Sequence, residues 1–295
     1  MNWETYKVVR STEEAFEYIG HFQGKARVVA GGTDLIPQLR EKETGDGIAL
    51  LDVSSIPEMR EIGLTDNGEW VMVGAAATMT EIAQSEIIAR YGRALAMGAS
   101  CMGAPQIRNV ATIGGNVVNA QPAADGTIPL LALGAEARII SANGERWAAL
   151  EGLFVDVGKS AVNPSEEIVT HFRFRPCPKT ASSSLQRLAK RKAFTLPTLV
   201  AACRVQLDAG KRVFEDVRLA LGPVARTPWL ASEAADSMRG EPVGHEAIRK
   251  AAAATKAAAQ PRDSIRGGAE YRKDMVEVLI KRAVTECLEL IGVDL

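Results

Sequence analysis

A run of small and turn-forming residues occupies positions 103–125, which read Gly103-Ala-Pro-Gln-Ile-Arg-Asn-Val-Ala-Thr112-Ile-Gly-Gly-Asn116-Val-Val-Asn-Ala-Gln-Pro-Ala-Ala-Asp125. The run is rich in Gly, Ala, Asn and Pro, yet it is too apolar to be a flexible linker. Such a segment is typical of packed backbone that surrounds a ligand. It therefore indicates a binding site within a folded chain.

The centre of this run is a glycine-rich turn. Two consecutive glycines leave the backbone N–H groups open to a ligand, because no Cβ stands in the way. The hydroxyl and carboxamide beside them have the donors and acceptors to bond phosphate or ribityl oxygens. The predicted contact residues of this turn are Thr112, Ile113, Gly114, Gly115 and Asn116.

A second glycine turn lies near the start of the chain, where a short apolar strand runs into two glycines. Consecutive N–H groups at such a turn form a nest for phosphate, and the helix that follows directs its positive end there. Two turns of this kind can clasp a pyrophosphate from both sides. On the residues alone, a plain strand-to-helix turn is the open alternative. The predicted contacts are Arg27, Val28, Val29, Ala30, Gly31, Gly32, Thr33 and Asp34.

Two charged residues of the run have two interpretations each. Asp125 precedes the helical stretch 128–133, so it either caps that helix or accepts hydrogen bonds from ribose or ribityl hydroxyls. Arg108 either assists phosphate binding or packs and forms a salt bridge. A basic run further along, 187–192, faces either an acidic partner or solvent.

Hydrophobic periodicity predicts a mixed α+β chain in two parts. The opening is a β-α-β-α-β unit with strands at 6–10, 27–30 and 48–53 and helices at 12–21 and 35–40, followed by a hairpin over 61–74 and helices at 80–85 and 91–97. Proline and serine clusters over 176–184 predict a domain boundary, because they disfavour both helix and sheet. Beyond it we expect strands at 198–207 and 213–221 and helices at 247–259 and 268–291.

Composition narrows the classes of function. The formal charge of -1, from 35 basic and 36 acidic residues, gives no global field that would draw the chain to nucleic acid. No apolar run reaches the roughly 20 residues of a membrane span, and the start at Met1-Asn2 lacks a signal-peptide pattern, so we expect a cytoplasmic protein. The four cysteines are far apart, which predicts free thiols and no iron–sulfur cluster in this chain. The three histidines, His21, His171 and His245, are isolated from any nucleophile or carboxylate at catalytic spacing, so no catalytic residue is predicted.

Three motifs together resemble those of one family. The chain resembles the FAD-binding medium subunits of the xanthine dehydrogenase and carbon monoxide dehydrogenase family. Motifs of that family are similar to the run 103–125, the turn Ala30–Asp34 and the stretch Ser264-Ile-Arg-Gly-Gly-Ala-Glu-Tyr-Arg-Lys273. The resemblance spans nearly the whole chain. It implies an FAD-binding domain of the vanillyl-alcohol-oxidase (PCMH) type over 1–177, with subdomains of about 1–55 and 56–177. A smaller α+β domain with a three-stranded antiparallel sheet would follow over 178–295.

The same resemblance assigns roles to residues. Arg27–Asp34 would line the pyrophosphate of FAD, the turn Thr112–Asn116 would form the second loop, and Asp125 would bind FAD hydroxyls. Ile168 or Val169 falls where the family packs an aliphatic side chain against the isoalloxazine. Arg187 falls where many members have a lysine near the flavin ring. FAD is the one cofactor implied.

The resemblance also implies partners. In the family a large molybdopterin-binding subunit oxidises the substrate, a small subunit carries two [2Fe-2S] clusters, and FAD passes the electrons to NAD or another acceptor. The three subunits form a heterotrimer that can dimerise. Two other functions stay open at this point: a free-standing flavin oxidoreductase with its own substrate, and an assembly subunit that has lost FAD.

Overall fold

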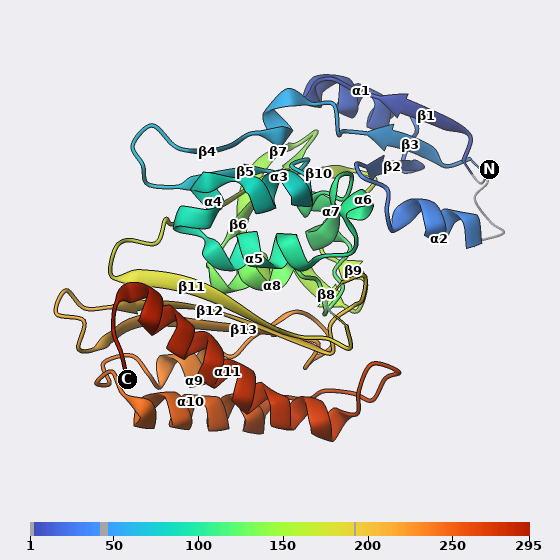
Figure 1. The fold of residues 1–295 in the computed structure, drawn as a ribbon. Coiled ribbons are helices and arrows are strands. Elements are labelled where there is room, and N and C mark those ends of the chain that lie inside the picture. The colour runs from blue at the N-terminus through green and yellow to red at the C-terminus, as the bar shows by residue number, and fades with distance from the viewer. Residues whose placement is uncertain (1–2, 42–46, 192) are drawn as a thin grey trace.

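The computed structural model describes residues 3–41, 47–191 and 193–295. Met1 and Asn2, which entered the expectation about the N-terminus, and Lys192 of the basic run lie outside the described residues. The described chain forms stacked layers of helices and sheets, with the N-terminal unit at one end and the C-terminal helices at the other (Figure 1).

The N-terminal unit is a three-stranded parallel sheet in the order β1-β3-β2. Its elements are β1 (Thr5–Val8), α1 (Thr12–His21), β2 (Ala26–Val29), α2 (Leu35–Glu41) and β3 (Ala49–Asp52). Helix α1 begins where predicted, because the side chain of Ser11 accepts a hydrogen bond from the Glu14 amide. The β-α-β-α-β prediction is confirmed, and β2 is left as an edge strand.

The middle of the chain forms a five-stranded antiparallel sheet in the order β4-β5-β10-β6-β7. Its strands are β4 (Ile62–Leu64), β5 (Val71–Gly74), β6 (Glu136–Ser141), β7 (Gly144–Ala149) and β10 (Glu167–Phe174), so the predicted hairpin over 61–74 is confirmed. A 3-10 turn at Pro57–Arg60 leads from the N-terminal unit into β4. A second at Leu150–Leu153 and the pair β8 (Phe154–Asp156) and β9 (Lys159–Ser160) lie between β7 and β10.

Short helices pack beside this sheet (Figure 1). The helix expected over 91–97 is instead two helices, because Gly92 ends one at Tyr91 and the next begins at Arg93. The set comprises α3 (Met79–Gln84), α4 (Glu86–Tyr91), α5 (Arg93–Cys101), α6 (Pro105–Arg108), α7 (Ile113–Val118) and α8 (Thr127–Ala132).

The C-terminal sheet has the order β11-β12-β13-β14, with strands Ala181–Leu188, Leu199–Leu207, Phe214–Gly222 and Trp229–Leu230. The resemblance implied three strands. A fourth is added because the chain turns back after β13 and pairs Trp229 and Leu230 with Leu221 and Ala220. Helices α9 (Ser232–Asp236), α10 (His245–Ala258) and α11 (Ala269–Ile291) complete this part.

The serine cluster that contributed to the predicted domain boundary lies inside strand β11. Ser183 accepts a hydrogen bond from the Ala94 amide at 3.1 Å, and the hydroxyl of Ser184 donates to the Ala283 carbonyl at 2.8 Å. Because both hydroxyls have buried partners, the strand is satisfied on its two faces. Tertiary partners therefore override the local preference of serine for turns.

The C-terminal sheet is shared between two hydrophobic cores. Along β12, Val200 and Ala202 belong to the core that contains α5 and α8, whereas Leu199, Ala201 and Cys203 belong to the core under α10 and α11. Successive residues of a strand point to opposite faces, so this sheet is buried on both sides. Figure 1 shows it between the two groups of helices.

Two glycines inside helices give a test of this packing. A Cβ on Gly98 in α5 would lie 2.1 Å from the Asp125 carbonyl oxygen, whereas a Cβ on Gly20 in α1 would meet nothing within 4 Å. We expect Gly98→Ala to lower the free energy of unfolding by about 1–3 kcal/mol through steric overlap. Gly20→Ala should raise it by about 0.5–1 kcal/mol, because alanine is the better helix former. Urea unfolding of both variants measures this, and a stabilised Gly98→Ala protein would contradict the close contact.

Candidate functional site

A pocket of about 1410 Å³ opens between the N-terminal unit, the middle of the chain and the C-terminal part. This volume exceeds the roughly 300–1,000 Å³ of sites for drug-sized ligands. Most of its wall comes from five segments, within which not every residue lines the pocket: 27–35, 111–125, 158–169, 194–197 and 262–272. Both predicted glycine turns are therefore in one cavity.

The first glycine turn follows the edge strand β2. Gly31 packs directly against the second run, since a Cβ there would lie 1.9 Å from the Val110 carbonyl oxygen. Gly32 has a φ of +64°, which favours glycine. Within the described part of the chain, the amides of Gly31, Gly32, Thr33 and Asp34 donate to no acceptor. These four N–H groups at the pocket wall match the predicted nest.

The second glycine turn differs from the expectation. Its amides are already used: Ile113 donates to Ala77, Gly114 donates to Ala75, and Gly115 donates to the Thr112 hydroxyl at 3.2 Å. Thr112 caps α7 through this last bond, so the prediction of free amides here is wrong. What the turn does offer is open surface. A Cβ on Gly115 would meet only the Thr112 hydroxyl, at 3.2 Å.

Asn116 also has a different role from the one predicted. Its side-chain oxygen accepts hydrogen bonds from the amides of Gly126 and Thr127, each at 3.1 Å. The carboxamide is therefore the cap of the turn that leads into α8. Asp125 does not cap that helix, because α8 begins after Gly126 with no side-chain cap bond from it.

Asp125 instead forms a two-point ion pair with Arg187. The distances are 2.9 Å from Nε to one carboxylate oxygen and 3.2 Å from Nη2 to the other. The side chains are 3% and 8% exposed. Burial raises the pKa of Asp125, and the Arg187 guanidinium opposes that shift by hydrogen bond and charge. Asp125 lines the pocket, whereas Arg187 is not among the lining residues.

The two candidate aliphatic residues are both at the pocket wall. Ile168 and Val169 lie on β10, where they are 1% and 7% exposed. The pairing of β10 with β6 shifts register just after them, between Val169 and His171. Ile113 is the one member of the two predicted turns that lies outside the lining, because its side chain is fully buried in the core.

The charges around the pocket are unbalanced. Two of the three acidic residues at the wall are paired with arginines, Asp125 with Arg187 and Glu167 with Arg146, which leaves Asp34. The basic residues at the wall are Arg27, Lys159, Arg262, Arg266 and Arg272. Arg27 donates to the Ser165 hydroxyl at 2.7 Å and has no acidic partner among the described residues. The excess of positive charge suits an anionic ligand.

Three of these arginines were not predicted to line a site. Arg272, 2% exposed, donates to the Thr198 carbonyl at 3.0 Å, to the Arg262 carbonyl and to the Ser264 hydroxyl. Burial, and then repulsion from Arg262 and Arg266, lowers its pKa. Arg272 thus holds the 262–264 turn against the start of β12. The signal available in the sequence was the motif 264–273 itself.

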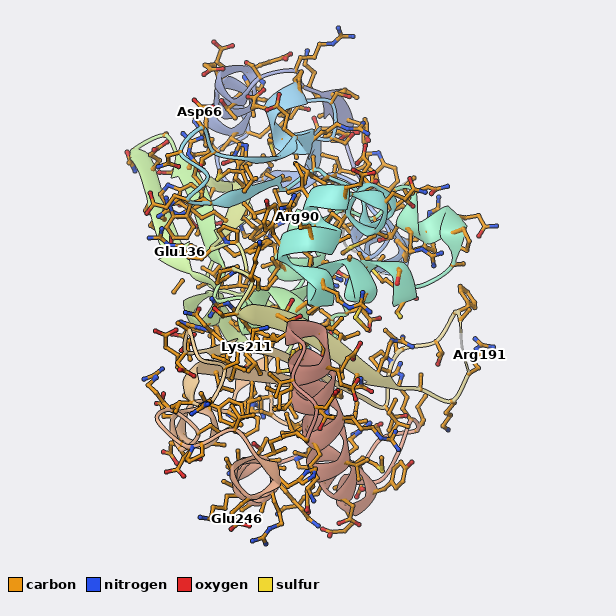
Figure 2. All side chains as sticks on the ribbon, turned by 60° about the vertical axis from the view of Figure 1, so that its left-hand side comes forward. Asp66, Arg90, Glu136, Arg191, Lys211 and Glu246 are labelled. Carbon is orange, nitrogen blue, oxygen red and sulfur yellow. The ribbon has the colours of Figure 1, made fainter. Side chains whose placement is uncertain are left out.

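The remaining sequence hypotheses have these outcomes. Arg108 donates to the Met102 carbonyl at 2.9 Å, which favours its packing role. In the basic run, Lys190 donates to the Ile265 carbonyl and Arg191 to the Phe194 carbonyl. Figure 2 shows Arg191 on the connection that projects from the C-terminal sheet.

Two of the four cysteines lie close together, although they are 84 residues apart in sequence. The sulfurs of Cys203 and Cys287 are 3.3 Å apart in the buried core.

The described residues 3–41, 47–191 and 193–295 lack two kinds of feature. No group of three or more His, Cys, Asp or Glu side chains is arranged to hold a metal ion. None of the helices in these ranges has the length and hydropathy to span a membrane.

The structural role of Asn116 gives a second prediction. Asn116→Ala leaves the amides of Gly126 and Thr127 without their acceptor, so the free energy of unfolding should fall by about 1–3 kcal/mol. Asn119 also lines the pocket, but its side chain makes no hydrogen bond within the described residues, so Asn119→Ala should stay within about 0.5 kcal/mol of wild type. Denaturant unfolding measures both variants, and an equal loss of unfolding free energy in Asn116→Ala and Asn119→Ala would contradict the capping role.

Two family models match the chain in succession. Residues 2–176 match the FAD binding domain in molybdopterin dehydrogenase, and residues 185–287 match the CO dehydrogenase flavoprotein C-terminal domain. Together they cover most of the chain.

Individual proteins agree with these models. The chain is 31% identical over 269 residues to the putative xanthine dehydrogenase FAD-binding subunit of Escherichia coli K12, covering 91% of this chain and 90% of that one. It is 28% identical to the carbon monoxide dehydrogenase medium chain of Hydrogenophaga pseudoflava, covering 95% of each. A solved structure of carbon monoxide dehydrogenase from the same organism superposes with a TM-score of 0.89 at 26% identity, covering 97% of each chain.

Proposed function

This chain belongs to the FAD-binding medium subunits of the xanthine dehydrogenase and carbon monoxide dehydrogenase family, and we propose that its pocket holds FAD as an electron relay between partner subunits and an acceptor. As a member of that family, the chain is an oxidoreductase subunit and its cofactor is FAD. The observation that carries the placement of the cofactor is the set of four unpaired amides in the first turn.

The residues at the pocket wall fit FAD in three respects. The amides of Gly31–Asp34 and the guanidinium of Arg27 supply donors and charge for a pyrophosphate. The bare surface of Gly115 leaves room where a side chain would intrude. The volume exceeds that of an ordinary small-molecule site, as a dinucleotide requires.

The redox end of the proposed site is formed by Ile168 and Val169. Their buried aliphatic side chains present an apolar surface that excludes water from a flat aromatic ring. FAD, when bound, supplies the exchange of electrons either singly or in pairs. The remaining task of the chain is to bind and orient that group.

The partners and the acceptor are proposed from the family resemblance. Two relatives are named medium chains of carbon monoxide dehydrogenase, a name that implies larger and smaller companions. We therefore propose a large molybdopterin-binding subunit and a small [2Fe-2S] subunit, arranged as a heterotrimer that can dimerise, with NAD as one acceptor. The division into 1–177 and 178–295, the vanillyl-alcohol-oxidase type of the first part and the cytoplasmic location stay predictions.

The two other functions fit the pocket less well. A free-standing flavin oxidoreductase needs a proton donor beside the ring, and the two side chains proposed for that end, Ile168 and Val169, are aliphatic. An assembly subunit without FAD would not require four amides free of protein acceptors at the wall of one pocket.

Gly115→Leu tests the placement of the cofactor. The new side chain enters open space at the pocket wall, so the FAD-free protein should keep its free energy of unfolding while the purified protein loses at least about tenfold in bound FAD. Gly152→Leu is the matched control, because a Cβ on Gly152 would meet nothing within 4 Å and Gly152 lies away from the pocket. Flavin absorbance per protein after gel filtration measures the result.

Two outcomes would contradict the proposal. Full flavin content in the Gly115→Leu protein would show that the cofactor does not pass this turn. Sustained turnover of an organic substrate by the purified chain, without partner subunits, would favour the free-standing enzyme over the relay.

A further inference from the structure

The two halves of the pocket wall meet at one buried arginine. Arg187 lies on β11 of the C-terminal sheet, and its guanidinium holds the Asp125 carboxylate from the middle of the chain. The same Nη2 donates to the Thr195 carbonyl at 2.6 Å. Asp125 and Thr195 both line the pocket, and Arg187 does not.

Asp125 is held from three sides. Its carboxylate is fixed by Arg187, the next two amides are fixed by Asn116, and its carbonyl touches α5 at Gly98. The 195–198 segment is likewise held at both ends, by Arg187 at the Thr195 carbonyl and by Arg272 at the Thr198 carbonyl. Two separate pocket walls thus share Arg187 as their common support.

We propose that Arg187 is a positioning residue that acts behind the pocket wall. It fixes the Asp125 carboxylate and the Thr195 backbone relative to each other, so that both are in place before FAD binds. This inference rests on the proposed function, since it takes FAD as the ligand. It differs from the role that the resemblance suggested, in which a cation at this position lies near the flavin ring.

The planar guanidinium is what makes this role possible. It bonds both carboxylate oxygens in parallel and still reaches a carbonyl, which a lysine ammonium on a flexible stem does not reproduce in one fixed geometry. Because the charge of Arg187 is balanced by Asp125, geometry rather than net charge is its contribution. The conservative substitution by lysine therefore separates the two roles.

The experiment measures the FAD dissociation constant of Arg187→Met, Arg187→Lys, Asp125→Asn and the Asp125→Asn/Arg187→Met double variant by flavin fluorescence titration. We expect each single variant to raise the FAD dissociation constant by about tenfold or more. The dissociation constant of the double variant should be no more than about threefold above that of the weaker-binding single variant. The FAD dissociation constant of Arg187→Lys should lie within about threefold of that of Arg187→Met.

Arg204 provides the matched control. It is a buried arginine on the neighbouring strand β12, paired with Asp216 at 2.8 Å, and it lies away from the pocket. Arg204→Met should leave the FAD dissociation constant within about twofold of wild type, as expected for distant sites. Thermal unfolding of each FAD-free variant shows whether it is folded, and Arg187→Lys serves as the mildest variant should Arg187→Met fail to fold.

Three results would overturn the inference. Wild-type affinity in Arg187→Lys would mean that charge alone suffices. Additive losses in the double variant would mean that Arg187 and Asp125 act independently. A loss in Arg204→Met as large as in Arg187→Met would mean that any buried arginine of this sheet matters only for folding. By contrast, absence of FAD from the wild-type protein would refute the proposed function itself.

Discussion

The close approach of the Gly31 and Val110 backbones is the contact on which the pocket depends. A single Cβ at Gly31 would lie 1.9 Å from the Val110 carbonyl oxygen, so the two runs can meet only if that side chain is absent. Their contact brings the first turn, with its unpaired amides, to the same wall as the open face of Gly115. The site therefore arises from the packing of two backbones.

The C-terminal sheet gives this site its second side. Because alternate residues of β12 enter two different cores, the C-terminal sheet packs onto α5 and α8 as well as onto its own helices. The loops at the ends of its strands and the turn before α11 consequently reach the pocket and bring arginines to it. A pocket built by both halves explains why motifs far apart in sequence line one cavity.

Sequence reasoning worked where a local pattern determines the structure. The parallel opening unit and the glycine turn after β2 follow from periodicity and from the lack of a Cβ at Gly31. It failed where the hydrogen-bond partners of a side chain lie far away in the sequence. Nothing near Asn116 in the chain shows that its carboxamide caps Gly126 and Thr127, and the buried partners of Ser183 and Ser184 come from α5 and α11. The resemblance pointed to Arg187 as a cation near the flavin ring, but only the fold shows that it is bonded to Asp125 and lies outside the pocket lining.

The most direct test of the account is a crystal structure of the chain with FAD bound. We expect the pyrophosphate oxygens to lie within hydrogen-bond distance of the amides of Gly31–Asp34, with the cofactor passing the bare surface of Gly115. A pyrophosphate bound elsewhere, with those four amides still unpaired, would contradict it.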